Sequence, residues 1–240
     1  MKLSVVIPIY NEERTLREIV GRVQDAPYEK ELILVDDCSR DSSRAIMAEL
    51  AEEYPNIRCF HHEKNTGKGG ALATGFQHIT GDVALIQDAD LEYDPADYPV
   101  LLRPILEGKA DVVFGSRFLG GPYVRVHLFY HYLANRFLTL VSNVFTNLNL
   151  TDMETCYKVF KKEAADQLDI QSRTFAVEPE ITAKVAKMRA RVYEVPISYA
   201  GRDYSEGKKI GPKDGFIAIA AIVRWALFGP KLKRISPPSE

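Results

Sequence analysis

The first half of the chain alternates short apolar runs with stretches of helical periodicity. Apolar runs at residues 3–9, 31–35, 57–61, 82–87 and 111–115 are predicted as strands. Helical spacing of apolar residues covers 12–25, 41–53, 68–79 and 95–107. The expected N-caps are Asn11, Ser39 or Asp41, and Asp94 before Pro95. This alternation predicts an α/β fold with a mostly parallel sheet covered by helices, whose ligands bind beyond the carboxyl ends of the strands.

Two segments of the second half are apolar over most of their surface. Residues 123–150 carry charges only at Arg125 and Arg136, and their polar residues recur every three or four positions along one helical face. Residues 216–228 are apolar except at Arg224 and precede a basic cluster. Each segment is expected to be buried or to lie in a membrane interface. Neither contains about 18 uninterrupted apolar residues, so no transmembrane helix is predicted.

Composition fits one globular domain. The chain has 240 residues, 46% of them hydrophobic, and a formal net charge of -2, which gives no sign of a nucleic-acid partner. From Gly201 onward, eight basic residues stand against four acidic ones, a local charge of +4 that fits an anionic ligand or lipid surface. The apolar start is too short for a signal peptide. The odd number of cysteines (Cys38, Cys59, Cys156) indicates reduced thiols, hence a cytoplasmic protein.

Three carboxylates follow the strand at 82–87. Asp88 and Asp90 are two positions apart and can converge on one hard cation, and Glu92 can add a third oxygen. A divalent ion there would bridge a diphosphate and neutralise a departing leaving group. A solvated acidic turn is the alternative interpretation. The position at the end of a strand favours the metal site.

Two other strands end in polar residues. Asp37 is placed to accept a hydrogen bond from the imide N–H of uracil or the equivalent edge of guanine, although helix capping by Asp36, Asp37 or Ser39 would give the same pattern. Tyr10 could stack on a base or ribose and Glu12 could bind a ribose hydroxyl, and an ordinary strand-to-helix turn is the alternative.

A glycine-rich turn at 65–71 opens a predicted helix and is expected to seat an anion. It is not a Walker A loop, because His62 stands where that motif needs Gly and Gly69 where it needs Ser or Thr. It is not a dinucleotide fingerprint either, because Leu72 occupies the third glycine position.

Taken together, these motifs resemble family 2 glycosyltransferases of GT-A fold, and within them the polyprenyl-phosphate glycosyltransferases of the dolichol-phosphate mannose synthase type. The matching segments are 6–12, 35–39, 65–69, 88–91 and 115–117, and the resemblance covers roughly residues 1–215. Five ordered motifs are far more specific than any one of them. The resemblance implies a Rossmann-like nucleotide-diphospho-sugar transferase fold with a mostly parallel sheet, followed here by apolar C-terminal helices.

The resemblance also implies roles for individual residues. Asp88 and Asp90, with Glu92 where relatives often have Gln, would bind Mg²⁺ or Mn²⁺ on the donor diphosphate. The expected catalytic residues are Asp152, Asp90 and Arg117, with Asp152 as acceptor contact or general base and a helix cap as its alternative. The expected acceptor-phosphate ligands are Arg117, Arg202, Lys208 and Lys209. The expected nucleotide-sugar ligands are Pro8, Tyr10, Glu12, Asp36, Asp37, Lys68, Asp88 and Ala89.

Two residue groups beyond this set have simpler interpretations. Cys156 is expected to be a buried structural thiol, because single displacement needs no nucleophilic residue. Glu178 and Glu180 are expected to begin a helix, with a sugar contact as the alternative.

The predicted function is metal-dependent, inverting transfer of a hexose, of the glucose or mannose class, from a UDP- or GDP-sugar to a polyprenyl or dolichyl phosphate at the cytoplasmic membrane face. Residues 1–212 would form the catalytic domain, with a nucleotide-sugar half (1–117) and an acceptor half (118–212). Residues 213–235 would form an interfacial helix and basic tail. The alternatives are transfer to a soluble or glycan hydroxyl, a nucleotidyltransferase, and a non-catalytic sugar-nucleotide-binding module.

Overall fold

The computed structural model describes residues 1–120, 128–174, 176–201 and 212–235. It contains one sheet of seven strands in the order β3-β2-β1-β4-β6-β5-β7. The strands are β1 (Leu3–Ile9), β2 (Lys30–Asp36), β3 (Ile57–His61), β4 (Val83–Ile86), β5 (Val112–Ser116), β6 (Lys158–Lys161) and β7 (Val192–Pro196). Only β6 is antiparallel to its neighbours, β4 and β5. The predicted α/β fold with a mostly parallel sheet is confirmed.

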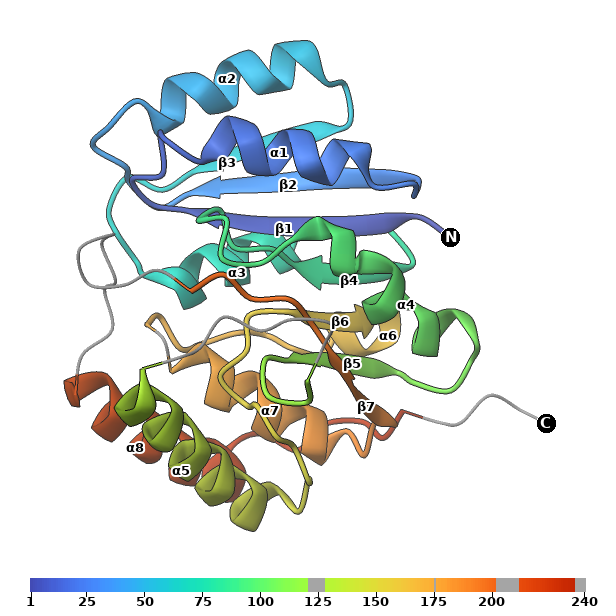
Figure 1. Ribbon diagram of the computed structural model, residues 1–240, viewed down its shortest axis with the longest axis vertical. Helices are drawn as coiled ribbons and strands as arrows, with labels where there is room; N and C mark the ends of the chain where they lie inside the picture. Colours follow the sequence, from blue (N-terminus) through green and yellow to red (C-terminus); the bar gives the residue numbers. More distant parts are fainter. Residues whose placement is uncertain (121–127, 175, 202–211, 236–240) are drawn as a thin grey trace.

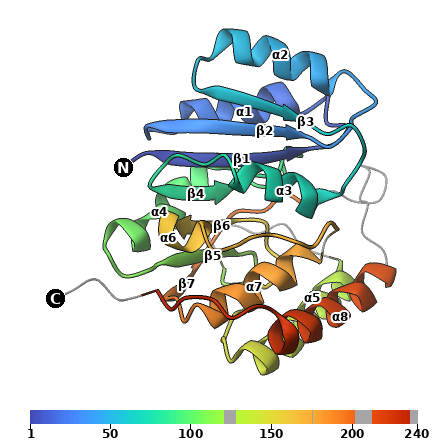
Figure 2. The same ribbon diagram turned by 180° about the vertical axis from the view of Figure 1, so that it is seen from behind.

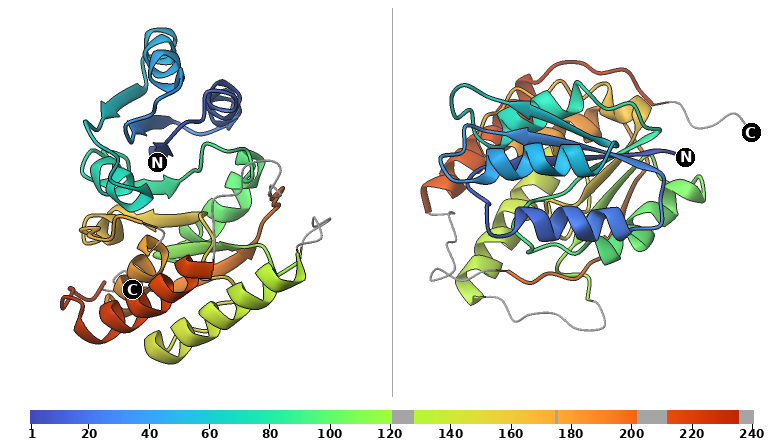
Figure 3. Two further views of the ribbon diagram at one scale, coloured as in Figure 1. Left: turned by 90° about the vertical axis from the view of Figure 1, so that its left-hand side faces the viewer. Right: turned by 90° about the horizontal axis from the view of Figure 1, so that it is seen from above.

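Helices cover both faces of the sheet. They are α1 (Leu16–Asp25), α2 (Ser43–Glu53), α3 (Lys68–Phe76), α4 (Tyr98–Leu106) behind a 3₁₀ turn (Pro95–Asp97), α5 (Phe129–Thr146), α6 (Lys162–Ala165), α7 (Val177–Lys187) and α8 (Pro212–Phe228). The edge-on view places α1 and α4 on one side of the sheet and α3 and α6 on the other (Figure 3). The rear view shows α3 and α7 in front of the strands (Figure 2). Strands β1, β2 and β4 are buried along most of their length, as expected for a sheet covered on both faces.

The start of α1 differs from the prediction. The helix begins at Leu16, and Asn11 is not its cap but adopts a left-handed conformation with φ 55°. The Asn11 side chain accepts a hydrogen bond from the Arg40 amide at 2.8 Å, and the Asn11 amide donates to Ser39 Oγ at 3.0 Å. Asn11 therefore joins the loops that follow β1 and β2. Asp94 does cap the 3₁₀ turn through the amide of Ala96 at 2.9 Å, as predicted.

Helix α5 buries its polar face and exposes most of its apolar face. Its buried residues are polar, Thr139 and Ser142, and the Thr139 hydroxyl accepts a hydrogen bond from the Met153 amide at 3.1 Å. Its apolar side chains face outward, with Tyr130 81% and Val144 73% exposed. The polar stripe seen in the sequence is therefore the surface that faces the protein. Leu138 and Val141 still pack against the core, and the rest of the apolar stripe is largely exposed.

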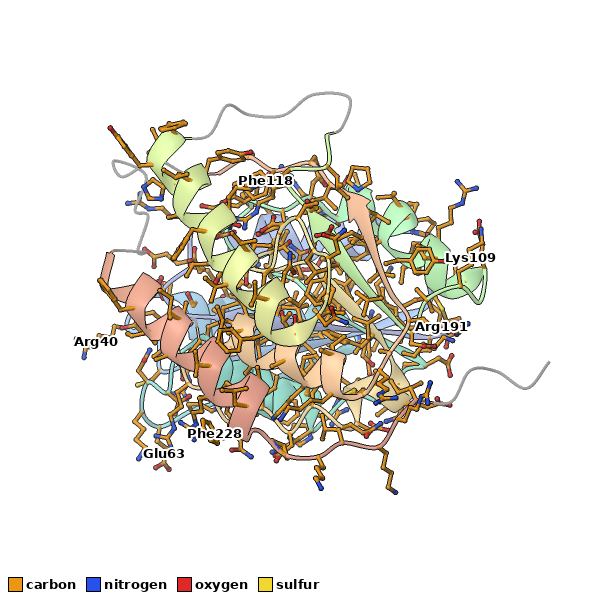
Figure 4. The ribbon with its side chains drawn as sticks, turned by 90° about the horizontal axis from the view of Figure 1, so that it is seen from below. Arg40, Glu63, Lys109, Phe118, Arg191 and Phe228 are labelled. Carbon is orange, nitrogen blue, oxygen red and sulfur yellow. The ribbon has the colours of Figure 1, made fainter. Side chains whose placement is uncertain are left out.

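Helix α8 lies beside α5 and packs on both α5 and α7. Figures 1 and 4 show α5 and α8 side by side on one outer face, with Phe228 labelled at the end of α8 in Figure 4. Trp225 is buried, and its indole N–H donates to Ser172 Oγ at 3.1 Å. Phe216 and Phe228 are exposed. Within the described ranges, no helix combines the length and apolar character that crossing a bilayer requires.

Candidate active site

The carboxyl ends of β1 and β2 point to the left in Figure 1, and most of the predicted site residues follow strands at this edge. Gln87 directly follows β4 and is fully buried, and its side chain supports the turn that carries Asp88. Its side-chain oxygen accepts hydrogen bonds from the hydroxyls of Tyr98 at 2.9 Å and Tyr157 at 2.8 Å. Its amide nitrogen donates to the carbonyl oxygen of Asp88 at 3.0 Å. The first predicted metal ligand is therefore anchored in the core.

A chain of opposite charges runs from this turn into the protein. The ammonium of Lys68, the first residue of α3, lies 2.9 Å from Asp88 Oδ1 and 3.3 Å from Glu178 Oε1. Glu178 also pairs with Lys158, and both of these side chains are buried. Burial lowers the pKa of Lys68, but Asp88 and then Glu178 outweigh it and hold that pKa well above its usual value. Lys68 is therefore a permanent cation beside Asp88.

The three predicted metal ligands are not gathered into one cluster. Glu92 accepts a hydrogen bond from the Tyr199 hydroxyl, and the Asp90 carboxylate accepts one from the Glu92 amide at 3.1 Å. No group of three or more His, Cys, Asp or Glu side chains in the described ranges is arranged to hold a metal ion. The three carboxylates are therefore not preformed as one cluster, and the metal role of Glu92 stays a prediction. Asp88 and Asp90 remain as hard oxygen donors, which fits Mg²⁺, an ion held in proteins by one or two carboxylates together with substrate phosphates.

The second charged centre is an ion pair between Arg117, just after β5, and Asp152. Arg117 Nε lies 2.6 Å from Asp152 Oδ2 and Nη2 lies 2.7 Å from Oδ1, a bidentate geometry. The Arg117 amide donates to the same carboxylate at 3.1 Å. Asp152 is fully buried. Both of its oxygens are thus engaged in orienting the guanidinium.

Tyr199 connects these two centres. Its hydroxyl donates to Glu92, and the Arg117 guanidinium carbon lies 5.1 Å from the centre of its ring, within cation–π range. The Ala200 amide donates to the Glu92 carbonyl oxygen at 2.9 Å. One side chain from the segment after β7 therefore ties the carboxylate turn to Arg117. Nothing in the spacing of the sequence singled out this tyrosine.

Asp37 faces the glycine-rich turn. Its Oδ1 accepts hydrogen bonds from the amide and hydroxyl of Thr66 and from His62 Nδ1, each at 2.8 Å. Its Oδ2 accepts one from the Gly67 amide at 2.7 Å. Since a carboxylate offers about four acceptor positions shared by its two oxygens, capacity for a further donor remains on Oδ2. The predicted base contact by Asp37 stays a prediction.

The glycines of the turn serve close packing. A Cβ on Gly67 would lie 2.1 Å from the carbonyl oxygen of Arg173, and one on Gly69 would lie 1.9 Å from that of Ser172. The Gly69 amide donates to the Arg173 carbonyl oxygen at 3.0 Å. This amide is therefore not available to an anion, and the expectation of an anion seat is wrong at that position, because the turn is covered by the 172–173 backbone.

The remaining predicted donor ligands lie around the same edge. Asp36 is buried, its Oδ1 accepts a hydrogen bond from the Ser39 amide at 3.0 Å, and its Oδ2 has no hydrogen-bond partner in the described part of the chain. Ala89 is buried, while Pro8, Tyr10 and Glu12 are half-buried at the end of β1 and in the following turn. The other predicted acceptor ligands, Arg202, Lys208 and Lys209, lie outside the described residues.

Two further side chains of the site were missed in the sequence. Glu194 on β7 accepts hydrogen bonds from the amides of Thr151 at 2.9 Å and Asp152 at 3.0 Å, which fixes the segment that carries Asp152. Glu154 lies in that segment, and burial raises its pKa to about 7. A glutamate two positions after Asp152 was the available signal, but the spacing alone does not show which way it faces.

Cys156 fits its predicted structural role. Its side chain is buried, and burial raises the pKa of its thiol well above the usual range. All three cysteines are free thiols, in agreement with the sequence prediction. Glu178 and Glu180 lie in the first turn of α7, so the predicted helix start is confirmed.

The mostly parallel sheet, with Asp88 and Asp90 after β4 and Arg117 after β5, agrees with the Rossmann-like GT-A fold that the sequence predicted. The chain matches the family model "Glycosyl transferase family 2" over residues 4–169. It is 30% identical over 233 residues to an undecaprenyl-phosphate mannosyltransferase of Micrococcus luteus, covering 95% of both chains. The chain therefore belongs to glycosyl transferase family 2, and it is a glycosyltransferase.

Two further comparisons agree with this assignment. A dolichol-phosphate mannosyltransferase of Pyrococcus furiosus is 30% identical over 215 residues, which are 88% of this chain and 60% of that protein's length. The crystal structure of glucosyl-3-phosphoglycerate synthase from Mycobacterium tuberculosis, in complex with Mn²⁺, UDP and glucosyl-3-phosphoglycerate, superposes with a TM-score of 0.71. It is 18% identical and covers 94% of this chain and 80% of that one. At this identity the likeness shows the GT-A fold alone.

Proposed function

We propose that this chain transfers a hexose, with inversion, from a UDP- or GDP-sugar to a polyprenyl phosphate at a membrane surface. The observation that carries the proposal is that Tyr199 contacts both Glu92, on the turn that also carries Asp88 and Asp90, and Arg117, an arginine suited to a phosphate. The names of the relatives from Micrococcus luteus and Pyrococcus furiosus support the acceptor class. The cytoplasmic face remains a prediction from the sequence.

On the donor side, Asp88 and Asp90 would hold Mg²⁺ or Mn²⁺, which when bound neutralises the diphosphate leaving group. Lys68 already lies against Asp88 and adds a second positive charge there. Asp37, Tyr10 and Glu12 border the same edge and would bind the nucleoside. This half of the site works by positioning and charge stabilisation, without a covalent intermediate.

On the acceptor side, Arg117 would bind the lipid phosphate. Asp152 fixes the plane of its guanidinium, and such a planar fork matches two phosphate oxygens at once. A phosphate monoester has a second pKa near about 6, so it arrives largely deprotonated at neutral pH. It therefore needs no general base, which agrees with an Asp152 carboxylate fully engaged by Arg117.

The outer face of α5 and α8, with the basic residues that follow α8, would contact the membrane. Apolar area and a basic flank together give reversible binding to an anionic lipid surface. On this proposal residues 213–235 serve as an interfacial segment that also packs on the catalytic domain through Trp225.

The test is transfer from radiolabelled UDP-glucose, UDP-N-acetylglucosamine and GDP-mannose to undecaprenyl phosphate in mixed micelles, with Mg²⁺, Mn²⁺ or EDTA. We expect one donor to be used, and transfer to be lost in EDTA. Octyl glucoside and free sugars serve as hydroxyl acceptors. Transfer to these with none to the lipid phosphate would contradict the proposal and favour the hydroxyl-acceptor alternative.

A further inference from the structure

The segment between α5 and β6 holds Glu154 in a fixed position. On one side of it, the Asp152 amide donates to the Glu194 carboxylate at 3.0 Å. On the other side, the buried ammonium of Lys158 donates to the carbonyl oxygen of Thr155. Because the neighbours of Glu154 are bonded to two different strands, β7 and β6, its side chain projects from a rigid support.

One carboxylate oxygen of Glu154 lacks a hydrogen-bond partner among the residues that the structure describes. Its Oε1 is enclosed and accepts no hydrogen bond from any described residue. Buried carboxylate oxygens without partners are rare, and each calls for a reason. Burial, followed by the charge of Glu178, raises the pKa of Glu154 to about 7, while Lys158 and Arg117 act in the opposite direction.

The contacts of its neighbours place Glu154 in the fold. Glu178 belongs to the chain of charges that reaches Asp88 through Lys68, with an ion pair of 3.3 Å between Lys68 and Glu178. Arg117 belongs to the acceptor side. Asp152, two positions before Glu154, binds Arg117. Thr155, the next residue, accepts a hydrogen bond from Lys158, the partner of Glu178. Glu154 is therefore flanked along the chain by the centre for the acceptor phosphate and by the centre for the donor diphosphate.

We propose that Glu154 is a specificity-determining residue that accepts a hydrogen bond from a hydroxyl of the sugar being transferred. This inference rests on the proposed function, because a sugar in transfer lies between the diphosphate it leaves and the phosphate it joins. A hydroxyl donor meets the unpartnered Oε1, and a site built to bond a hydroxyl discriminates strongly against sugars that lack it.

The test compares Glu154→Leu and Glu154→Gln with wild type by calorimetric binding of the best nucleotide sugar and of its nucleoside diphosphate, in Mn²⁺. We expect Glu154→Leu to weaken nucleotide-sugar binding about 10- to 100-fold, as for a lost bond to a charged acceptor, and to leave the nucleoside diphosphate unchanged. Glu154→Gln keeps a neutral acceptor of the same shape, so its loss should be only a few-fold. Glu163→Gln, on the exposed surface of α6, is the matched control.

A panel of deoxy donors identifies the contact. The donor that lacks the bonded hydroxyl should bind wild type and Glu154→Leu with equal affinity. The other deoxy donors should still bind Glu154→Leu more weakly than wild type. Equal weakening of nucleoside diphosphate and nucleotide sugar would show a structural role and overturn the inference, and so would no change in either. Should Glu154→Leu unfold, the same comparisons made with Glu154→Gln decide. Wild type that binds the nucleoside diphosphate but no UDP- or GDP-sugar would overturn the proposed function as well.

Discussion

At the scale of single residues, the Arg117–Asp152 pair changes what a mutation at Asp152 can be expected to do. The carboxylate is fully buried and both oxygens bind the guanidinium. Removing one partner of a buried ion pair leaves an uncompensated charge, at a cost of about 3–5 kcal/mol. A loss of activity in an Asp152 variant therefore has to be separated from a loss of stability.

We expect Asp152→Asn to lower the free energy of unfolding by about 3 kcal/mol and to raise the acceptor KM, because Arg117 loses its orientation. Arg117→Lys keeps the charge but not the planar fork, so it should raise the acceptor KM about tenfold with the donor KM unchanged. Steady-state kinetics and urea unfolding measure both effects. A fall in kcat of about 10²–10⁴ for Asp152→Asn, at unchanged acceptor KM, would instead identify Asp152 as a general base on a hydroxyl.

At the scale of elements, α5 has a polar face toward the protein and an apolar face toward the outside. The exposed side chains Phe137, Leu140 and Val144 lie on that outer face and are 54%, 60% and 73% exposed. The helix is held on the protein by the polar contacts of its inner face and by the packing of Leu138 and Val141 on the core. The apolar face is then free to enter a lipid interface.

We expect Phe137→Ser with Leu140→Ser to weaken binding to vesicles of phosphatidylglycerol and phosphatidylcholine on the order of 100-fold, since each apolar side chain contributes about 1.5 kcal/mol or more when buried in lipid. The melting temperature should not change, because neither side chain is buried in the protein. Co-sedimentation measures binding, and Leu106→Ser, an exposed leucine at the end of α4, is the control. Full vesicle binding by the double variant would rule out α5 as the contact.

At the scale of the whole molecule, ligand binding must appear as added stability. A ligand present at 100 times its Kd stabilises the native state by about 2.7 kcal/mol. For a chain of this size that corresponds to a rise in melting temperature of roughly 5–10 °C. The proposed metal–diphosphate site predicts that nucleoside diphosphate and Mn²⁺ together raise the melting temperature by more than the sum of the rises that each causes alone.

We expect Asp90→Asn to remove this metal-dependent increment while the melting temperature without ligand stays as in wild type, because Asp90 is only half-buried at a turn. Differential scanning fluorimetry with and without EDTA measures the increment. Asp166→Asn, an exposed carboxylate directly after α6, should behave as wild type. An unchanged increment in Asp90→Asn would remove Asp90 from the metal site.

The sequence by itself determined the strands and helices of the first half, because the apolar runs of β1, β2, β4 and β5 are buried strands and an apolar run is a local signal. It also determined the residues at the strand ends, since a motif such as Asp88-Ala89-Asp90 follows its strand directly. It predicted neither β6 nor β7, because these short strands carry polar residues that only their neighbours explain: Lys158 pairs with Glu178, and Glu194 with backbone amides of the Asp152 segment.

Only the tertiary structure decided which side chains meet. Asp152 and Arg117 are 35 positions apart and form one ion pair, and Tyr199 reaches Glu92 from 107 positions away. The direction that α5 faces was also undecided, because a helix with one polar stripe can bury either side. The physical reason is the same in each case: periodicity reports the local conformation, whereas the partner of a charge or of an apolar face is set by the chain topology that brings distant segments together.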